Sequence, residues 1–391
     1  MISPGWRQFK LSHILNLEYG KGLSNRQRKN GTYPVVGSNG IIGYHDQSLI
    51  KGPGIIIGRK GTIGAINWID SDFWPIDTTF YVKIKTNDVD LRWLYYSLSH
   101  LNLPKLSLSD VVPGLKRELV YSLKLVLPPL PEQKKIAEIL STVDQAIEKV
   151  DEAIGKIQRL KKALMQELLT KGIGHKEFKE TEIGSVPRPW QIKKLGDISK
   201  EIYRYPTYYN IEYKEEGIKE IRGELIKENG EIESDKTKFR CISHETSEKY
   251  KRTILETGDF VITVRGTMGK IGIVSEYLAG SNITANLMRV SLDRRYCFPD
   301  FYKYVFLSRL FQRKLSLLSP QTTIRTIQAP RLKSMSIPLP SLQEQRQIAE
   351  IMGTVDKKLD CLRYKKDKLE RTKKALMEDL LIGKKRVILE T

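Results

Sequence analysis

The sequence has little of what a metal site or a disulfide framework requires. Its three cysteines, Cys241, Cys297 and Cys361, lie far apart, and its five histidines are scattered along the chain. No Cys-x-x-Cys pair is present, and the ligand spacings of zinc sites are absent. The sequence therefore implies neither a zinc site nor a disulfide-bonded secreted domain, and we expect no bound metal.

Long apolar segments are missing as well. The first residues, Met1 to Trp6, contain no apolar run of the kind found in a signal peptide. No stretch approaches the roughly 18 apolar residues that are needed to span a bilayer. We therefore expect a soluble, cytoplasmic protein that has no membrane partner.

Motifs of catalysis are also absent. Gly269-Lys270 is followed by Ile271 and lacks the preceding glycine spacing of a nucleotide-binding P-loop. Asp151-Glu152-Ala153 is similar to a helicase motif, but it lies inside a helix with heptad periodicity, where a solvated surface is expected. The Asn/Asp-Pro-Pro-Tyr/Phe motif of amino-methyltransferases and a nuclease carboxylate cluster are not found. The sequence therefore predicts no catalytic residue.

Positive charge is what the sequence has in excess. Lysine and arginine total 66 against 46 acidic residues, which gives a formal net charge of +20. Such an excess favours a polyanionic partner, most simply nucleic acid, and a basic ribosomal or membrane-surface protein is the alternative. The 391 residues, of which 40% are hydrophobic, suggest two or three domains with buried cores.

The chain contains an internal repeat. Residues 130–140 read LPEQKKIAEIL and residues 342–352 read LQEQRQIAEIM, at an offset of 212. Sequence matches nearer the start of each repeat have shorter offsets. Residues 61–64 (GTIG), for example, match residues 266–269 (GTMG) at an offset of 205. Each repeat therefore consists of a globular part of variable length followed by a part of fixed length.

The parts of fixed length are predicted to be long helices. Apolar residues recur there at alternating steps of four and three, which is the period of a coiled coil. We expect helices over about residues 132–170 and 344–382, and Ser341 with Glu344 has the spacing of a capping box. Glycines that would end the helices follow both segments: Gly172, Gly174 and Gly383.

Each helix has one apolar stripe that needs a partner. With globular parts between the helices in one chain, an antiparallel pair is the natural geometry, and packing against another subunit is the alternative. Lys161 and Lys373 occupy equivalent positions in the stripes, and we expect their charges to extend into solvent. The expected packing seam consists of Ile136, Leu140, Val143, Ile147, Ile348, Met352, Val355 and Leu359.

The globular parts are predicted to be rich in strands. Residues 55–57 and 260–264 are apolar runs beside glycine, as in short buried strands, and residues 91–98 and 301–310 have the pattern of short helices. The expected fold class is α+β. It consists of two strand-rich globular domains joined by a pair of long antiparallel coiled-coil helices, with an internal two-fold pseudo-repeat.

The repeated glycine turns and two polar stretches hold the candidate contacts to nucleic acid. A tight glycine turn lets backbone N–H groups approach a phosphate, and a neighbouring arginine or lysine can neutralise phosphate or read guanine. The polar residues 38–40 and 321–325 include side-chain types that pair with bases. An ordinary basic hairpin turn and a solvated loop are the alternatives. The candidate DNA-binding residues are Ser38, Asn39, Arg59, Lys60, Thr62, Arg265, Thr267, Lys270, Gln321, Thr322 and Arg325.

Taken together, these features resemble the specificity subunits of type I restriction enzymes. The resemblance lies in residues 33–44 (YPVVGSNGIIGY), residues 217–223 (GIKEIRG), the paired Gly-Thr-x-Gly turns and the Leu-Pro-x-x-x-Glu-Gln-x-x-Ile-Ala-Glu-Ile helix starts. It covers nearly the whole chain in the expected order. One departure is that residues 285–287 (ANL) have residues 80–82 (FYV) as their expected counterpart, so the two domains need not contact DNA alike.

The resemblance implies a division of labour. Residues 1–128 and 176–338 would be target-recognition domains, each reading one half of an interrupted double-stranded DNA site. Residues 129–175 and 339–391 would be conserved helices that set the gap and dock two modification (methyltransferase) subunits. Restriction/translocase subunits would join through those partners. S-adenosylmethionine, ATP and Mg²⁺ would be bound by the partners, and this chain would hold no cofactor and carry out no catalysis.

Two other classes of function remain open. A standalone fused nuclease–methyltransferase is disfavoured by the missing motifs and the limited length. An RNA-binding module is suggested by Gly-Thr-Ile-Gly, which resembles the GxxG loop of KH domains, but those modules lack long paired helices.

Overall fold

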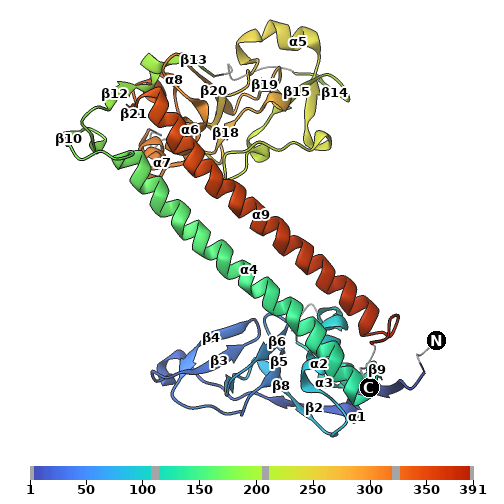
Figure 1. Cartoon of the computed structure of the whole chain (residues 1–391). Helices are drawn as coiled ribbons and strands as arrows, with labels where there is room; N and C mark the ends of the chain where they lie inside the picture. Colours follow the sequence, from blue (N-terminus) through green and yellow to red (C-terminus); the bar gives the residue numbers. More distant parts are fainter. Residues whose placement is uncertain (1–3, 107–113, 205–210, 319–325, 388–391) are drawn as a thin grey trace. The chain divides into compact units, whose positions relative to one another are not determined.

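The computed structural model describes residues 4–106, 114–204, 211–318 and 326–387. It divides into two compact units (Figure 1). Unit 1 consists of residues 1–153 and 362–391, and unit 2 consists of residues 154–361. The expected domain limits at 128, 175 and 338 lie near the ends of the long helices, whereas the compact units divide within the helices.

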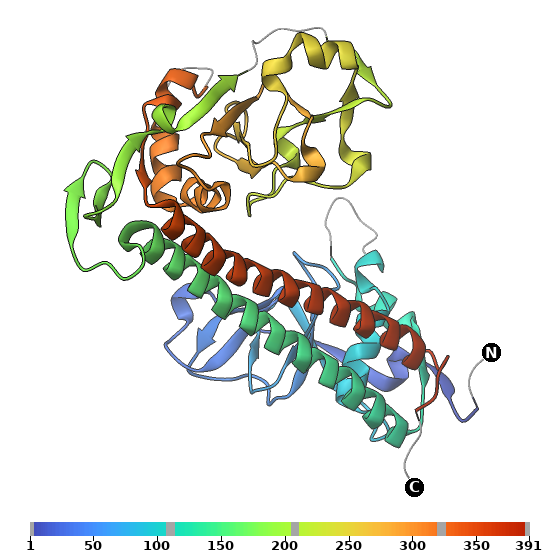
Figure 2. The same ribbon diagram turned by 45° about the horizontal axis from the view of Figure 1, so that its top comes forward.

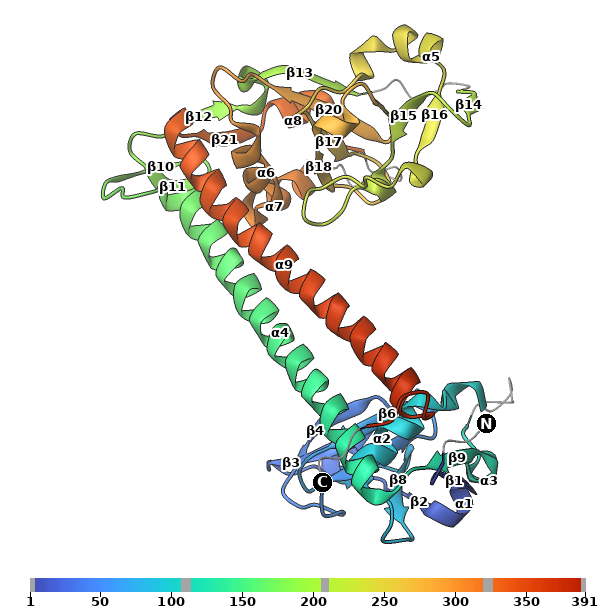
Figure 3. The same ribbon diagram turned by 45° about the vertical axis from the view of Figure 1, so that its right-hand side comes forward.

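The two long helices form where the heptad pattern predicts them. They are α4 (Leu130–Lys171) and α9 (Leu342–Leu380). Within each unit, the segments of α4 and α9 lie side by side and run in opposite directions (Figures 1 and 3). The α+β fold class, with two long helices that pack together and a two-fold repeat, is therefore confirmed.

The helix ends use glycine as predicted but use the capping box only in part. Gly172, Gly174 and Gly383 follow the helices with φ values of +64°, +72° and +72°, a region that glycine adopts without steric cost. The Ser341 hydroxyl accepts from the backbone N–H of Glu344 at 3.2 Å. The Glu344 carboxylate does not complete the box, because it accepts from other groups that are described below.

The seam residues differ in burial along the helices. Ile136 and Leu140 are fully buried in the core of unit 1, beside Leu380, and belong to the globular core as well as to the seam. Ile348 and Met352 are fully buried in the core of unit 2. The remaining positions of the predicted seam are less uniform: Leu359 is buried, and Val143, Ile147 and Val355 are half-buried.

The lysines in the apolar stripes are paired rather than solvated, which corrects our expectation. In unit 1, Lys373 Nζ lies 2.6 Å from Asp144 Oδ1. The Tyr96 hydroxyl donates to the other carboxylate oxygen of Asp144 at 2.7 Å. The lysine charge is therefore neutralised by the facing helix.

Unit 2 repeats this arrangement at the same offset of 212. Lys161 Nζ lies 2.5 Å from Asp356 Oδ1, and the Tyr304 hydroxyl donates to Asp356 Oδ2 at 2.9 Å. The lysines, the aspartates and the two tyrosines connect α4 and α9 to a short helix of each globular part. Removal of one partner would leave a half-buried charge without its counter-ion.

These contacts predict a dependence of stability on alkaline pH. Burial, and then the charge of Asp356, raise the pKa of Tyr304 above its ordinary value of 10.0. The unfolded chain ionises this tyrosine first, so stability is fully present below about pH 10 and is lost as the pH rises further. Urea unfolding measures the free energy of unfolding at each pH. Above pH 10 this free energy should decline less steeply in Tyr304→Phe than in the wild-type protein, by at most about 1.4 kcal/mol per pH unit.

A matched control for this titration is Tyr364→Phe on α9. The Tyr364 side chain is 70% exposed. In Tyr364→Phe the free energy of unfolding should decline with pH as it does in the wild-type protein. An equal decline in the wild-type, Tyr304→Phe and Tyr364→Phe proteins would contradict the prediction.

The described part of unit 1 contains the two-stranded pair β1–β9 and two larger sheets, which lie beside short helices. One sheet has the strand order β2-β8-β5-β6 with antiparallel neighbours, and the other has the order β4-β3-β7. The elements of unit 1 besides the long helices are β1 (Arg7–Lys10), α1 (Leu11–Ile14), β2 (Leu15–Tyr19), β3 (Tyr33–Gly37), β4 (Gly40–His45), β5 (Gly54–Gly58), β6 (Ile66–Ile69), β7 (Trp74–Pro75), β8 (Thr79–Ile84), α2 (Leu91–His100), α3 (Arg117–Ser122) and β9 (Lys124–Leu127).

Unit 2 repeats this plan with additions. Its two four-stranded sheets have the orders β13-β20-β17-β18 and β14-β16-β15-β19, and β10–β11 and β12–β21 form two-stranded sheets (Figure 3). Its elements besides the long helices are β10 (Phe178–Thr181), β11 (Gly184–Pro187), β12 (Gln191–Lys194), β13 (Ser199–Arg204), β14 (Tyr213–Lys214), β15 (Ile218–Ile221), β16 (Arg240–Ile242), α5 (His244–Lys249), β17 (Phe260–Thr263), β18 (Ile271–Ile273), β19 (Asn282–Ile283), β20 (Leu287–Leu292), α6 (Pro299–Leu307), α7 (Arg309–Leu317), α8 (Ala329–Lys333) and β21 (Ser336–Leu339).

Hydrogen bonds identify equivalent positions and correct one expected match. The N–H of Arg59 donates to Thr78 O at 2.9 Å in unit 1, and the N–H of Val264 donates to Asn286 O at 2.8 Å in unit 2. The structural counterpart of Asn286 is therefore Thr78 rather than Tyr81. The reason is that unit 2 has three more residues between the glycine turn and β20, which raises the offset from 205 to 208.

Each unit also has a buried joint between the start of one long helix and the chain that follows the other. In unit 1, Trp6 Nε1 donates to Glu132 Oε2 at 3.0 Å, and Arg386 Nε donates to Glu132 Oε1 at 2.7 Å. Arg386 also donates to Pro4 O at 2.8 Å, where the end of the C-terminal helix lies beside the first strand (Figure 2). In unit 2 the equivalent hydrogen bond is donated by Trp190 Nε1 to Glu344 Oε2, at 2.8 Å.

Among the described residues, no helix is long and apolar enough to cross a membrane.

Candidate nucleic-acid interface

The glycine turn of unit 1 is held by its own backbone. β5 is buried along its length and leads into the turn at Arg59. The N–H groups of Arg59 and Lys60 both donate to Thr78 O, at 2.9 and 3.1 Å, and the N–H of Gly64 donates to Gly58 O at 2.8 Å. These amides are therefore not free to bind a phosphate.

Ser38 supports this turn from inside. Its side chain is buried, and its hydroxyl lies 2.9 Å from Thr78 O and also within hydrogen-bonding distance of Lys60 O. Ser38 is thus in position to support the turn rather than to reach a base. The neighbouring Asn39 is exposed at the tip between β3 and β4.

Two guanidinium groups flank one exposed aromatic ring beside the turn of unit 1. The Arg59 guanidinium lies 5.0 Å from the centre of the Tyr19 ring, and the Arg117 guanidinium lies 4.6 Å from it. Tyr19 is half exposed at the end of β2 and packs against Phe80. Among the described residues, no carboxylate pairs with either arginine. This cluster presents two positive charges and an aromatic face to solvent.

The glycine turn of unit 2 has the same backbone pattern and different side chains. The N–H of Gly269 donates to Thr263 O at 2.9 Å, and the Thr263 hydroxyl donates to Thr267 O at 2.6 Å. Lys60 of unit 1 is replaced by Arg265, which is half-buried and lies 3.4 Å from the Thr326 hydroxyl.

The turn tips expose further candidates. Gly61 and Gly266 have φ values of +76° and +71°, and an added Cβ would meet no atom within 4 Å, so the backbone conformation alone requires glycine there. Thr62 and Thr267 are exposed at the tips, and Lys270 is half-buried at the start of β18. Gln321, Thr322 and Arg325 lie outside the described residues.

Sequence reasoning missed three residues of these surfaces, Tyr19, Arg117 and Arg204. Arg204 is the last residue of β13 and lies opposite Met288, just as Tyr19 lies opposite Phe80. Burial, and then the charge of Arg265, lower the pKa of Arg204. No sequence motif marks these positions, because Tyr19 and Arg204 lie at the ends of strands whose sequences differ between the repeats and Arg117 begins the short helix α3.

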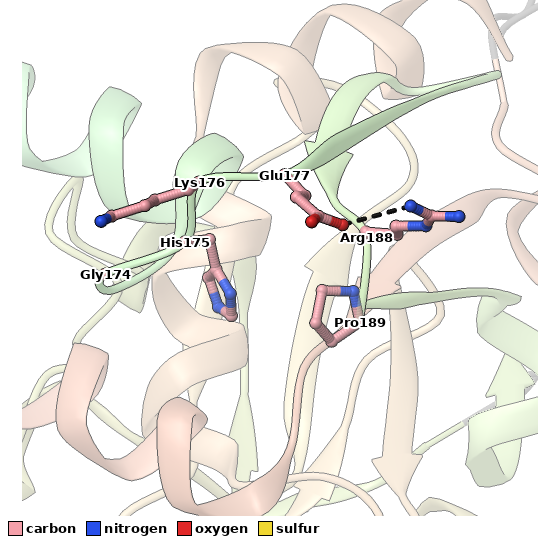
Figure 4. A pocket seen from close by; sticks show the side chains of 6 residues that line it. All are labelled: Gly174, His175, Lys176, Glu177, Arg188 and Pro189. Atoms are coloured by element: carbon pink, nitrogen blue, oxygen red, sulfur yellow. Dashed lines mark hydrogen bonds and ion pairs between the residues drawn. The ribbon is translucent and has the colours of Figure 1, made fainter.

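A separate cavity of about 440 Å³ lies at the joint of unit 2, away from the glycine turn. It is lined by residues 174–177, Arg188 and Pro189, and the Glu177–Arg188 ion pair spans 3.1 Å at its edge (Figure 4). His175 points to Glu344, with Nε2 at 2.9 Å from Oε1. Within the described part of the chain, no group of three acidic, histidine or cysteine side chains could hold a metal.

The chain matches one protein family over most of its length. The profile of the type I restriction modification DNA specificity domain matches residues 4–159 and 187–371, once in each repeat. The type I restriction enzyme MjaVIII specificity subunit of Methanocaldococcus jannaschii is 29% identical over 364 residues, which cover 90% of this chain and 80% of that protein. The putative MjaX specificity subunit of the same organism is 30% identical, covering 77% and 69%.

A more distant relative and two solved structures agree with this match. The type I restriction enzyme EcoBI specificity subunit of Escherichia coli is 25% identical, over 89% of this chain and 78% of that protein. The S subunit of a type I restriction–modification system from M. genitalium superposes with a TM-score of 0.66 at 16% identity, covering 97% and 96% of the two chains. A chain from a type I restriction–modification system has a TM-score of 0.57 at 15% identity, covering 98% and 99%. At these identities the structures show the shared fold.

Proposed function

The chain belongs to the family of type I restriction–modification DNA specificity proteins, and we propose that each of its two units reads one half of an interrupted double-stranded DNA site. It supplies DNA sequence specificity. The observation that carries the proposal is the pair of equivalent basic turns. They follow β5 and β17, which are equivalent strands of the two units, and they are surrounded by different side chains. Equal scaffolds with unequal surfaces suit two unequal half-sites.

We further propose that the chain is a non-catalytic subunit that docks two modification subunits. The exposed faces at the starts of the two long helices repeat: Lys134 and Glu138 on α4 match Arg346 and Glu350 on α9. Two similar surfaces in one chain suit two copies of the same partner. Restriction/translocase subunits would join through these partners, which would bind S-adenosylmethionine, ATP and Mg²⁺.

DNA binding by the full chain tests the first proposal. In fluorescence anisotropy, a duplex of about 30 base pairs should bind more tightly than a single-stranded RNA of equal length. Its affinity should fall steeply with salt concentration, because phosphate contacts release counterions. Tighter binding of the RNA would favour an RNA-binding module and overturn the proposal.

The second proposal is tested by turnover and mass. The purified chain alone should neither transfer a methyl group from S-adenosylmethionine to DNA nor cut DNA with ATP and Mg²⁺. With saturating modification subunit, native mass measurement should show two copies per chain. Turnover by the pure chain, or a single bound copy, would contradict this part.

A further inference from the structure

Arg204 occupies an unusual place at the edge of the unit 2 sheet. β13 and β17 lie on opposite sides of β20, where Arg204 and Ile262 are both cross-strand partners of Met288. The turn that carries Arg265 begins just after β17. Both strands are antiparallel to β20, so the sheet brings Arg204 and Arg265, which are 61 residues apart in the sequence, to the same end of the two strands that flank β20.

The guanidinium group of Arg204 has donors without acceptors. Its Nε and Nη2 atoms are buried, and they have no hydrogen-bond partner among the residues that the structure describes. Nitrogen–hydrogen groups that are removed from water normally find an acceptor within the protein. An acceptor supplied by a ligand would satisfy them.

The charge at this place is also uncompensated. The only hydrogen bond recorded for the Arg265 side chain among the described residues is the one from its Nε to the Thr326 hydroxyl at 3.4 Å. No carboxylate in the described residues forms an ion pair with Arg204 or Arg265. Burial of the Arg204 guanidinium, and then the positive charge of Arg265, lower the pKa of Arg204.

We propose that Arg204 and Arg265 together bind one backbone phosphate of the DNA, so that this pair positions unit 2 on the duplex without reading a base. The inference rests on the proposed function. An anion with several acceptor oxygens satisfies the buried donors and relieves the repulsion of the two cations. A guanine edge offers acceptors but no net negative charge, so it would leave the repulsion in place.

Unit 1 does not offer the same site. At the position equivalent to Arg204 it has Tyr19, which lies between Arg59 and Arg117. The guanidinium groups there already contact the aromatic ring. The paired-arginine site is therefore a feature of unit 2.

The test is the salt dependence of duplex binding by the full chain. The probe is a random-sequence duplex of about 30 base pairs, and the readout is the slope of log K against log of the KCl concentration. Arg204→Gln and Arg265→Gln should each reduce the steepness of the slope. Because both side chains bind the same phosphate, the double variant should reduce it by about 0.9 in total.

The matched control is Arg188→Gln, which removes the same charge from unit 2 at an exposed ion pair with Glu177. It should leave the slope unchanged. Equal slopes for Arg204→Gln and Arg188→Gln would overturn the inference. A slope that is less steep by about 1.8 in the double variant would also overturn it, because it would indicate contacts to two phosphates.

A second probe separates phosphate from base contacts. An alternating A·T duplex contains no guanine, and the variants should weaken binding to it as much as to the mixed-sequence duplex. A loss confined to guanine-containing DNA would overturn the phosphate assignment. If Arg204→Gln lowers the melting temperature, Arg265→Gln alone carries the test. Failure of the wild-type chain to bind any duplex would instead contradict the proposed function.

Discussion

Exchange of residues 154–361 for the same unit of another family member is expected to change one half of the recognised DNA sequence and leave the other half unchanged. The two units have separate cores, and each has its own basic turn. Sequence is read by side chains that reach base edges, so the half-site should move with the unit that carries them.

The limits of the exchanged segment follow from packing. An exchange of residues 176–338 alone would leave Leu168 and Leu169 of α4 and Ile348 and Met352 of α9 in a foreign core, because these side chains are buried in unit 2. Loss of complementary packing at such positions typically costs about 1–3 kcal/mol each. Exchange of residues 154–361 keeps these helix segments with the core that they complete.

Methylome sequencing of a host that carries the chimeric chain with its modification subunit measures both half-sites at once. The control is the reciprocal exchange, which should keep the half-site that the first chimera replaces. A change in both half-sites after either exchange would show that the units do not read DNA independently.

Glu344→Gln is expected to destabilise unit 2 by about 2–4 kcal/mol. Glu344 is 9% exposed, and its carboxylate accepts from the backbone N–H of Ile173 at 3.0 Å and from Trp190 Nε1 at 2.8 Å. His175 Nε2 lies 2.9 Å from Glu344 Oε1, the oxygen that also accepts from Ile173. A glutamine has only one acceptor oxygen, so its NH2 group would face one of the N–H donors that the second carboxylate oxygen now satisfies.

Hydrogen exchange followed by mass spectrometry measures this effect in each unit separately. Peptides from the core of unit 2 should exchange roughly 30- to 1,000-fold faster, and peptides from unit 1 should be unaffected. The matched variant Glu132→Gln removes the same acceptor from Trp6 and Arg386, so its effect should be confined to unit 1. Glu177→Gln, at an exposed ion pair, should change neither unit. Unchanged exchange in the Glu344→Gln protein would show that the joint does not stabilise the unit.

The long helices and the repeat could be predicted from the sequence because their signals are local and periodic. A heptad pattern needs only residues that are three and four apart, and the constant offset of 212 between the helix starts shows that both helices are built alike. The glycine turns were recognisable for a similar reason, since Gly61 and Gly266 must be glycine to adopt positive φ. Strands β5 and β17 follow from short apolar runs beside glycine.

The candidate site could be predicted only in part. The sequence pointed to the basic turn but not to Tyr19, Arg117 or Arg204, since each comes from a different strand or helix. The offset between the repeats changes from 205 to 208 between the turn and β20, so alignment by sequence paired Asn286 with the wrong residue. Only cross-strand hydrogen bonds place Arg204 where unit 1 has Tyr19.

Local sequence thus determined the two-fold plan of this protein: its long helices, its glycine turns and its net positive charge. Tertiary structure alone decided how the polar side chains are used. Lys161 and Lys373 were expected in solvent, but they face Asp356 and Asp144, which are 195 and 229 residues away in the chain. Glu344 has the spacing of a capping residue, but its carboxylate accepts from Trp190. The physical reason is that a buried charge or donor is stabilised by whichever complementary group the fold brings within about 3 Å, and that group need not be near in sequence.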